Sequence, residues 1–378
     1  MSSAEGTISR TIMETETGTT YTEARELDIL QRVLVIRLGA FGDVVRTIPA
    51  VDALKDRYPS AEITWLVDES SANILEKLEC LDSVITLSRK SFFRDISSAR
   101  SALREIRRRK FTCVLDFHGL SRSGLFSLLS GCRYRVGFAK RHVREFNSMF
   151  NNFFVDPGTD FISRYEKNHS LVELFDVPPK KEPPVLNIPI EEKNEVNSFL
   201  DSLGGKGFVC LHPGTSWRGR YKRWFPKKFS AVADHIIENY GLDVVLLFTE
   251  EERGIVEEIA SKTRNELQLS PKVNQRQLAY IIGKAVLYVG LDSGSMHVAS
   301  LVKTPIVALF GPTNIIHDRP YHYAPYRLVH GDADCAPCRV RDCDDRVCMH
   351  SIEPQHVTAA IDELLEEIIP AQAPQESC

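Results

Sequence analysis

Residues 32–43 read RVLVIRLGAFGD, a short apolar run that leads into two glycines and an aspartate. Such a run, without alternation of apolar and polar residues, is typical of a strand buried on both faces of a parallel sheet. Glycines after a strand allow backbone to come close to a ligand, and the N-terminus of a following helix favours an anion. The stretch therefore predicts the first βα unit of a doubly wound α/β fold.

The same rhythm recurs in both halves of the chain. In the first half, it predicts strands at 32–37, 62–67, 83–87 and 112–117, with helices near 43–57, 70–78, 97–109 and 121–130. In the second half, it predicts strands at 208–212, 243–248, 287–290 and 306–310, with helices near 226–240, 250–263, 274–283 and 294–301. Two Rossmann-like domains follow from this alternation.

Local changes in composition indicate where the domain boundaries lie. Residues 1–30 carry six acids against two bases and read as a flexible N-terminal tail, whereas 177–189 holds five of the 19 prolines. Proline fixes φ and removes a backbone donor, which makes that segment a semi-rigid linker. The predicted division is a tail at 1–30, an N-terminal domain at 31–177, a linker at 178–190, a C-terminal domain at 191–353 and a last helix and tail at 354–378. The last helix is predicted at 354–368, and the sequence does not indicate what it packs against.

Overall composition narrows the classes of protein. The 378 residues have a net charge of −4, with 43% hydrophobic and 26% charged residues, which is typical of a folded globular chain. A chain-wide basic surface for nucleic acid is excluded. Neither a run of about 18 apolar residues nor a signal peptide is present, so the sequence predicts a cytoplasmic protein.

The glycine turn leaves two roles open for Asp43. Its G-x-x-G-D spacing lacks the G-x-G-x-x-G dinucleotide pattern, although Asp68 after the second strand could bind a ribose as in a dehydrogenase. Aspartate at the start of a helix is often an N-cap. From spacing alone, a capping role and a catalytic role for Asp43 are equally supported.

Two motifs in the second half suit a phosphate. LHPGTS at 211–216 ends a strand and precedes KRW at 222–224, while GLDSGSMH at 290–297 ends another strand and opens a helix. Such loops at strand carboxyl ends, backed by free helix amides, can hold a diphosphate. The alternatives are a solvated Lys-Arg pair and an ordinary capped helix with a partly buried His297.

Cys335, Cys338, Cys343 and Cys348 lie within 14 residues and suggest a structural zinc loop, with reduced thiols packed under the loop as the alternative. A nucleic-acid-binding zinc module is disfavoured because four acidic residues near these cysteines would repel phosphate. The D-A-D sequence at 332–334 is interpreted as solvated loop charge. A second local bias is basic: residues 89–144 hold fifteen Lys/Arg against three acids.

Taken together, these motifs resemble those of glycosyltransferase family 9, the ADP-heptose:lipopolysaccharide heptosyltransferases. The resemblance covers nearly all of 32–357, in the family's order, through the matches RVLVIRLGAFGDVVRTIPAVDALK (32–55), DFHGLSRS (116–123), RVGF (135–138), RE (144–145), HPG (212–214), KRW (222–224), DSGSMHVA (292–299) and FGPT (310–313). It implies the GT-B fold, with two Rossmann-like domains facing a central cleft, the first binding the acceptor and the second the nucleotide-sugar donor.

The resemblance also implies roles for individual residues. Asp43 corresponds to the family's catalytic base, and Gly42, Arg122 and Arg144 fall on the acceptor side. The donor side would comprise Thr215, Ser216, Lys222, Asp292, Ser293, Gly294 and His297, with either Glu251 or Glu252 holding the nucleoside. Catalysis of this type needs no metal cofactor. His118 stands where many members have Gln, and 217–221 is an insertion, which leaves the acceptor and the exact sugar open.

The implied reaction is inverting transfer of a heptose from ADP-heptose to an anionic lipopolysaccharide-core acceptor. The basic segment at 89–144 suits an acidic acceptor and peripheral contact with the cytoplasmic face of a bacterial inner membrane. The alternative is a nucleotide-sugar binding protein without transfer activity, or an epimerase, on the same scaffold. The presence of Asp43 favours the enzyme, because donor binding in the second domain needs no base in the first.

Overall fold

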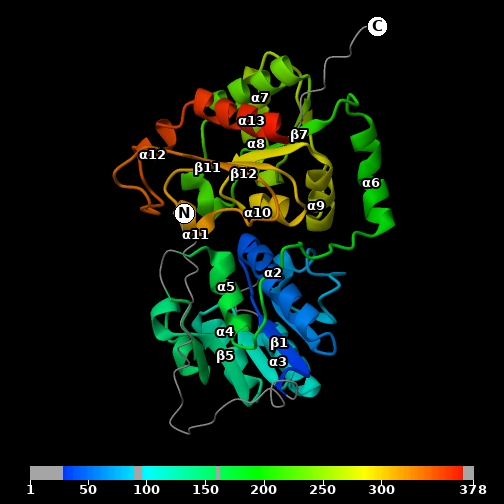
Figure 1. Ribbon diagram of the computed structural model, residues 1–378, viewed down its shortest axis with the longest axis vertical. Helices are drawn as coiled ribbons and strands as arrows, with labels where there is room; N and C mark the ends of the chain where they lie inside the picture. Colours follow the sequence, from blue (N-terminus) through cyan, green and yellow to red (C-terminus); the bar gives the residue numbers. More distant parts are fainter. Residues whose placement is uncertain (1–28, 89–95, 159–161, 369–378) are drawn as a thin grey trace, which may run out of the picture. The chain divides into compact units, whose positions relative to one another are not determined.

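The computed structural model of the protein describes residues 29–88, 96–158 and 162–368 (Figure 1). The chain divides into two compact units, 1–187 and 188–378, at a point inside the segment interpreted as a proline-rich linker. The predicted tails at 1–28 and 369–378 lie outside the described residues. Ile29 and Leu30, assigned to the tail from sequence, are instead 4% and 1% exposed and belong to the first unit.

The first unit contains a parallel sheet of six strands in the order β3-β2-β1-β4-β5-β6. The strands are β1 (Arg32–Ile36), β2 (Glu62–Asp68), β3 (Ser83–Leu87), β4 (Cys113–Asp116), β5 (Tyr134–Phe138) and β6 (Phe153–Val155). The helices are α2 (Phe41–Arg57), α3 (Ile96–Arg109), α4 (Ser121–Leu129) and α5 (Arg164–Glu173). Leu34, Ile36 and Val114 are completely buried in its core, as expected for central parallel strands.

The second unit repeats the plan, with the strand order β12-β11-β10-β7-β8-β9. The strands are β7 (Phe208–His212), β8 (Asp243–Leu246), β9 (Gln268–Leu269), β10 (Leu287–Leu291), β11 (Ile306–Phe310) and β12 (Tyr326–His330). The helices are α6 (Ile190–Asp201), α7 (Pro226–Tyr240), α8 (Arg253–Lys262), α9 (Gln275–Lys284), α10 (Gly294–Leu301), α11 (Ile315–Asp318), α12 (Val347–His350) and α13 (Pro354–Ile368).

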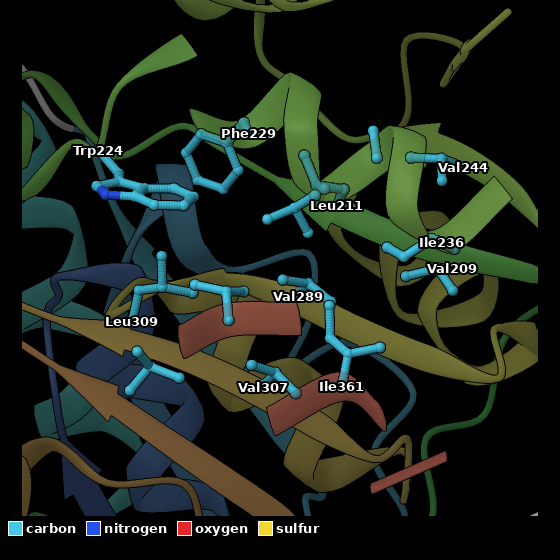
Figure 2. Packing of buried hydrophobic residues seen from close by; sticks show 14 of the residues in the cluster. Val209, Leu211, Trp224, Phe229, Ile236, Val244, Val289, Val307, Leu309 and Ile361 are labelled. Carbon is cyan, nitrogen blue, oxygen red and sulfur yellow. The ribbon is translucent and has the colours of Figure 1, made fainter. Parts of the chain in front are cut away.

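The core of the second unit joins the last helix to the sheet. Figure 2 shows the buried cluster around Trp224 and Phe229, whose ring centroids lie 5.0 Å apart, edge to face. The Trp224 indole donates a hydrogen bond to the carbonyl of Ile352, 3.0 Å away, and Ile361 of α13 belongs to the same cluster. The packing partners of α13, which the sequence left open, are therefore α7 and β12 (Figure 1).

The structure also differs from the sequence-based predictions. The helix predicted at 70–78 is wrong, because only a short 3-10 turn at Glu69–Ser71 forms, and Lys77 in the turns that follow has φ 69°. Strands β5 and β12 were not predicted because polar residues interrupt their apolar runs, and β6 and β9 were not predicted because they have only three and two residues. Helices α5 and α6 were missed because most of their residues are polar and α6 fully buries only Val196.

The strand order creates a switch point in each unit. β1 lies between β2 and β4, so the loops after β1 and β4 diverge at the carboxyl edge of the sheet. β7 lies between β8 and β10 in the same way. Open α/β sheets bind ligands in the crevice between such diverging loops. Among the helices of the described residues, none is long and apolar enough to cross a bilayer.

Candidate active site

Asp43 lies in the first turn of α2, next to the carboxyl end of β1. The N-cap of this helix is Ala40, so the capping role considered for Asp43 is wrong. Its carboxylate, 23% exposed, is instead surrounded by arginines: Arg37 Nη2 lies 2.8 Å from Oδ2, Arg46 donates to Oδ1, and Arg164 Nη1 lies 3.9 Å from Oδ1. A carboxylate at the switch point of the first unit thus carries three cationic neighbours.

These arginines keep Asp43 ionised. Burial by itself would raise the pKa of Asp43, but the charges of Arg37, Arg46 and Arg164 and the hydrogen bond from Arg46 outweigh it. The pKa of the carboxyl is therefore held well below the usual range of aspartate. The group is therefore an anion at neutral pH, which is the form a proton acceptor needs.

Three different elements hold the arginine cluster in place. Arg37, at the end of β1, donates to the carbonyl of Phe117, which follows β4. The carbonyl of Arg46 in α2 accepts from Asn168 Nδ2 of α5 at 3.1 Å. Arg164 is the first residue of α5, whose N-cap Ser163 accepts from the amide of Glu166 at 3.2 Å. Sequence reasoning missed all three arginines; the S-x-x-E capping box at 163–166 was the available signal for α5.

His118 lies on the neighbouring turn after β4. Its amide donates to the buried carboxylate of Asp116 at 3.0 Å, and its ring hydrogen-bonds the backbone of Gly39, four residues before Asp43. Burial, then the charges of Arg37 and Arg122, lower the pKa of His118 to about 3. The imidazole is therefore neutral and links the turns that follow β1 and β4.

The predicted acceptor residues of the first unit lie at this same edge. Gly42 is in the first turn of α2, and Arg122 is in the first turn of α4. The Arg122 guanidinium pairs with Asp68 at 3.1 Å, so the aspartate considered for ribose binding is engaged by an arginine. Arg144 is exposed, and its amide donates to the carbonyl of Gly119 at 3.0 Å, which fixes its backbone beside the β4 turn.

In the second unit, hydrogen bonds join the loops after β7 and β10. The Nδ1 atom of His212 lies 2.6 Å from the Ser295 hydroxyl, which also lies 2.9 Å from both the Ser293 hydroxyl and the Tyr288 phenol. His212 and Tyr288 were not among the predicted site residues. This network fixes the start of α10, where backbone amides can face an anion.

Lys222 and Asp292 form the charged part of this edge. Lys222 Nζ lies 3.0 Å from Asp292 Oδ2 and also donates to the Asp292 carbonyl. Residues 217–222, most of which are the insertion noted from sequence, form a 3-10 turn that carries Lys222 to this position. Thr215 is buried and accepts from Arg223 Nε at 3.3 Å. Lys222 therefore lies beside the loop after β10, and its charge is neutralised by the Asp292 carboxylate.

The other predicted donor residues occupy distinct environments. Ser216 is exposed, Gly294 is the first residue of α10, and His297 is 1% exposed inside that helix. Glu251 is exposed, whereas Glu252 is buried and accepts from the amide and hydroxyl of Thr249, both at 2.9 Å. Of the two acids considered for the nucleoside, Glu252 is engaged in capping its own turn, and Glu251 has the accessible carboxylate.

The four cysteines do not present a metal site in the described chain. No group of three or more His, Cys, Asp or Glu side chains among the described residues could hold a metal ion. Cys335 is exposed and Cys348 is buried; burial and then the nearby thiols of Cys338, Cys335 and Cys343 raise the pKa of Cys348. The structure thus lends no support to the zinc loop, which stays a prediction for metal analysis.

Comparison with known proteins identifies the family. The model for glycosyltransferase family 9 (heptosyltransferase) matches residues 99–347, about two thirds of the chain. The chain belongs to glycosyltransferase family 9. Lipopolysaccharide heptosyltransferase 3 of Escherichia coli K12 is 26% identical over 342 residues, covering 87% of this chain and 97% of that protein.

Solved structures agree in fold with this family member. The glycosyltransferase family 9 protein of Veillonella parvula superposes with a TM-score of 0.77 at 20% identity, covering 89% of this chain and 97% of that chain. The E. coli heptosyltransferase WaaC with ADP gives a TM-score of 0.69 at 17% identity, covering 88% and 99%. The chain is therefore a glycosyltransferase of the heptosyltransferase type, with the two-domain α/β GT-B fold.

Proposed function

We propose that this family 9 enzyme transfers a heptose from ADP-heptose to an anionic lipopolysaccharide-core acceptor, with inversion at the anomeric carbon and Asp43 as general base. The observation that carries the proposal is the ionised Asp43 carboxylate at the switch point of the first unit, surrounded by three arginines. Relatives named lipopolysaccharide heptosyltransferases, and a neighbour solved with ADP, support the choice of sugar and nucleotide.

Asp43 would remove the proton from an acceptor hydroxyl as its oxygen attacks the anomeric carbon. A carboxylate whose pKa is held low is a weak base, so the free site is poorly tuned for this step. Binding of an acidic acceptor would alter the pKa of Asp43. The anionic groups of the acceptor would bind Arg37, Arg46 or Arg164 and so weaken the interaction of these arginines with the Asp43 carboxylate. The pKa of Asp43 would then rise toward the range of an effective base only when the acceptor is bound.

The second unit would stabilise the departing ADP. Negative charge grows on its diphosphate as the bond to the sugar breaks, and preorganised donors stabilise that charge most effectively. Lys222 and the free amides at the start of α10 are the donors available, once Lys222 exchanges Asp292 for phosphate. We propose that these groups supply the charge stabilisation without a metal, which chelation by EDTA would test: loss of turnover would contradict it.

The test of the function is Asp43→Asn. Asparagine keeps the size of the side chain but removes the proton-accepting charge, so transfer to a lipopolysaccharide-core acceptor should fall at least about 10²-fold. ADP affinity should be unchanged, because the proposed donor residues all lie in the second unit. Lys222→Ala is the matched variant and should weaken ADP binding instead.

Three outcomes would overturn parts of the proposal. Turnover of Asp43→Asn within a few-fold of the unmodified protein would exclude Asp43 as the base. ADP binding without transfer to any acceptor, in the unmodified protein, would favour a nucleotide-sugar binding protein. Interconversion of the free nucleotide sugar would favour an epimerase on the same scaffold.

A further inference from the structure

Exposed apolar side chains lie on α4 and on the segment at 145–151, which packs against α4 in the first unit. Leu128, Phe146 and Met149 are 42%, 70% and 75% exposed, and we call them the α4 strip. In the described part of the first unit, the one other large hydrophobic residue with comparable exposure is Val185. Single exposed hydrophobic residues are ordinary on protein surfaces, but three on a helix and the short segment that packs against it call for a physical explanation.

Hydrogen bonds hold the segment at 145–151 against α4 and the residue that precedes it. At the start of the helix, the Ser121 amide donates to Glu145 Oε2 at 2.8 Å and the Phe146 amide donates to the Ser121 hydroxyl at 3.2 Å. Near the end, the Ser127 hydroxyl donates to Asn151 Oδ1 at 2.7 Å. Between these points, Asn147 donates to the Leu120 carbonyl at 2.9 Å.

These hydrogen bonds keep Phe146 and Met149 on the outside. The space beneath the segment is filled by Phe150, which lies so close to Gly124 that a Cβ there would be 2.5 Å from the ring. Asn147 is completely buried. The backbone of Phe146 and Met149 is therefore held next to the inward-facing side chains of Asn147 and Phe150. Leu128 lies one helical turn beyond Gly124, on the same side of α4. The α4 strip is therefore held at the surface by ordered backbone.

Basic residues flank both ends of the α4 strip. At the end of α4, Arg107 Nε donates to the Leu129 carbonyl at 2.8 Å, and at its start Arg144 is exposed. Further exposed cations on the adjoining segments are Arg104, Arg108, Arg133, Lys140 and Arg141. Residues 96–144 hold twelve Lys/Arg and two acids, Glu105 and Asp116.

The nearby acids offset part of this charge but leave an excess of cations. Glu105 is paired with Arg108 and Arg109, and Asp116 is completely buried. Glu145 accepts from the amide at the start of α4, and Asp156 pairs with Arg141. The surface around the α4 strip is thus apolar at its centre and positive at its ends, which matches a bilayer surface with anionic headgroups.

We propose that the α4 strip is a membrane-contact surface, which seats the first unit on anionic lipid with Phe146 and Met149 inserted among the acyl chains. The start of α4 adjoins the edge that carries Asp43 and Arg122, so this contact would bring that edge to a lipid-borne acceptor. The inference goes beyond the transfer reaction, because binding to lipid vesicles is measured without donor or acceptor.

The experiment is sedimentation of the full chain with vesicles of phosphatidylethanolamine and phosphatidylglycerol, and with vesicles of phosphatidylcholine. The unmodified protein should bind the anionic vesicles, and less so as salt is raised. The double variant Phe146→Ser/Met149→Ser should bind them at least about tenfold more weakly, since each side chain contributes apolar area. The matched control Val340→Ser/Val347→Ser removes two half-exposed apolar residues of the second unit and should bind as the unmodified protein does.

Thermal unfolding of each variant would verify folding, and the exposed positions are expected to leave its midpoint unchanged. Equal binding of the double variant and the unmodified protein to anionic vesicles would overturn the proposal, as would absence of binding by the unmodified protein. A change from dimer to monomer in the double variant, with vesicle binding retained, would assign the α4 strip to a second copy of the chain instead. None of these outcomes depends on Asp43, so they leave the proposed function to its own test.

Discussion

The arginines around Asp43 lead to a prediction about how activity depends on pH. Because the arginines hold the pKa of Asp43 low, the carboxyl should produce no acid limb in kcat/KM between about pH 5 and 8. Arg164→Gln removes one positive charge 3.9 Å from the carboxylate, so the pKa should rise and activity should fall earlier as the pH is lowered. The pH–rate profile measures this, with Arg327→Gln in the second unit as control. Superimposable profiles for Arg164→Gln and the unmodified protein would contradict it.

His118 makes a second prediction, about stability. Its pKa is about 3 in the folded protein against about 6.5 in an unfolded chain, so between these values the unfolded state binds the extra proton. The free energy of unfolding should therefore decrease as the pH falls from about 6.5 toward 3, by at most about 1.4 kcal/mol per pH unit from this residue. His118→Gln, which cannot titrate, should show a shallower decrease in urea unfolding at pH 7 and pH 5. An unchanged slope would show that the imidazole is not held neutral.

At the residue scale, the sequence predicted the position of Asp43 but not its environment. The aspartate stands two residues from a strand-to-helix turn, which is a local pattern. Arg37, Arg46 and Arg164 reach it from the end of β1, from α2 and from α5, so their convergence depends on tertiary packing. The capping alternative failed for a related reason, since the helix starts earlier than the apolar pattern indicated.

At the scale of elements, the loop after β7 makes a prediction. A Cβ on Gly214 would lie 2.2 Å from the carboxyl of the buried Glu252, so Gly214→Ala must move the loop or the start of the next helical segment. We expect a loss of about 1–3 kcal/mol in the free energy of unfolding and weaker ADP binding. Gly254→Ala is the matched control, because a Cβ there meets nothing within 4 Å and alanine favours a helix. ADP titration and urea unfolding of both variants check this; unaltered stability and affinity in Gly214→Ala would contradict the tight packing.

Central and peripheral elements differed in how well the sequence predicted them. Strands β1, β7 and β11 are continuous apolar runs, and helices α7, α10 and α13 have the predicted bounds. The missed strand β5 has partly exposed Tyr134 and Arg135, and β6 has three residues, none of them fully buried. Periodicity reports burial, so elements that bury little produce a weak pattern. The missed α5 matters most, because it carries Arg164.

At the scale of the whole molecule, the net charge of −4 is the sum of a strongly basic segment and an acidic remainder. Residues 96–144 of the first unit hold twelve Lys/Arg against two acids, while the proposed donor residues belong to the second unit. The residue counts in the sequence already predicted this uneven distribution of charge. They did not show which cations pair, since the ion pairs of Arg122 with Asp68 and of Arg141 with Asp156 join residues far apart in the chain.

This uneven distribution of charge predicts different salt dependence for the two substrates. Exposed cations such as Arg104 and Arg108 act over distances at which salt screens them, since the Debye length is about 10 Å at 0.1 M. The KM for an acidic acceptor should therefore rise several-fold as ionic strength is raised. Lys222 is 18% exposed and would bind phosphate at short range, so ADP affinity should fall much less. Arg104→Gln/Arg108→Gln should flatten the salt dependence of the acceptor KM and leave that of ADP unchanged, whereas equal salt dependence for both substrates would mean that the basic segment does not attract the acceptor.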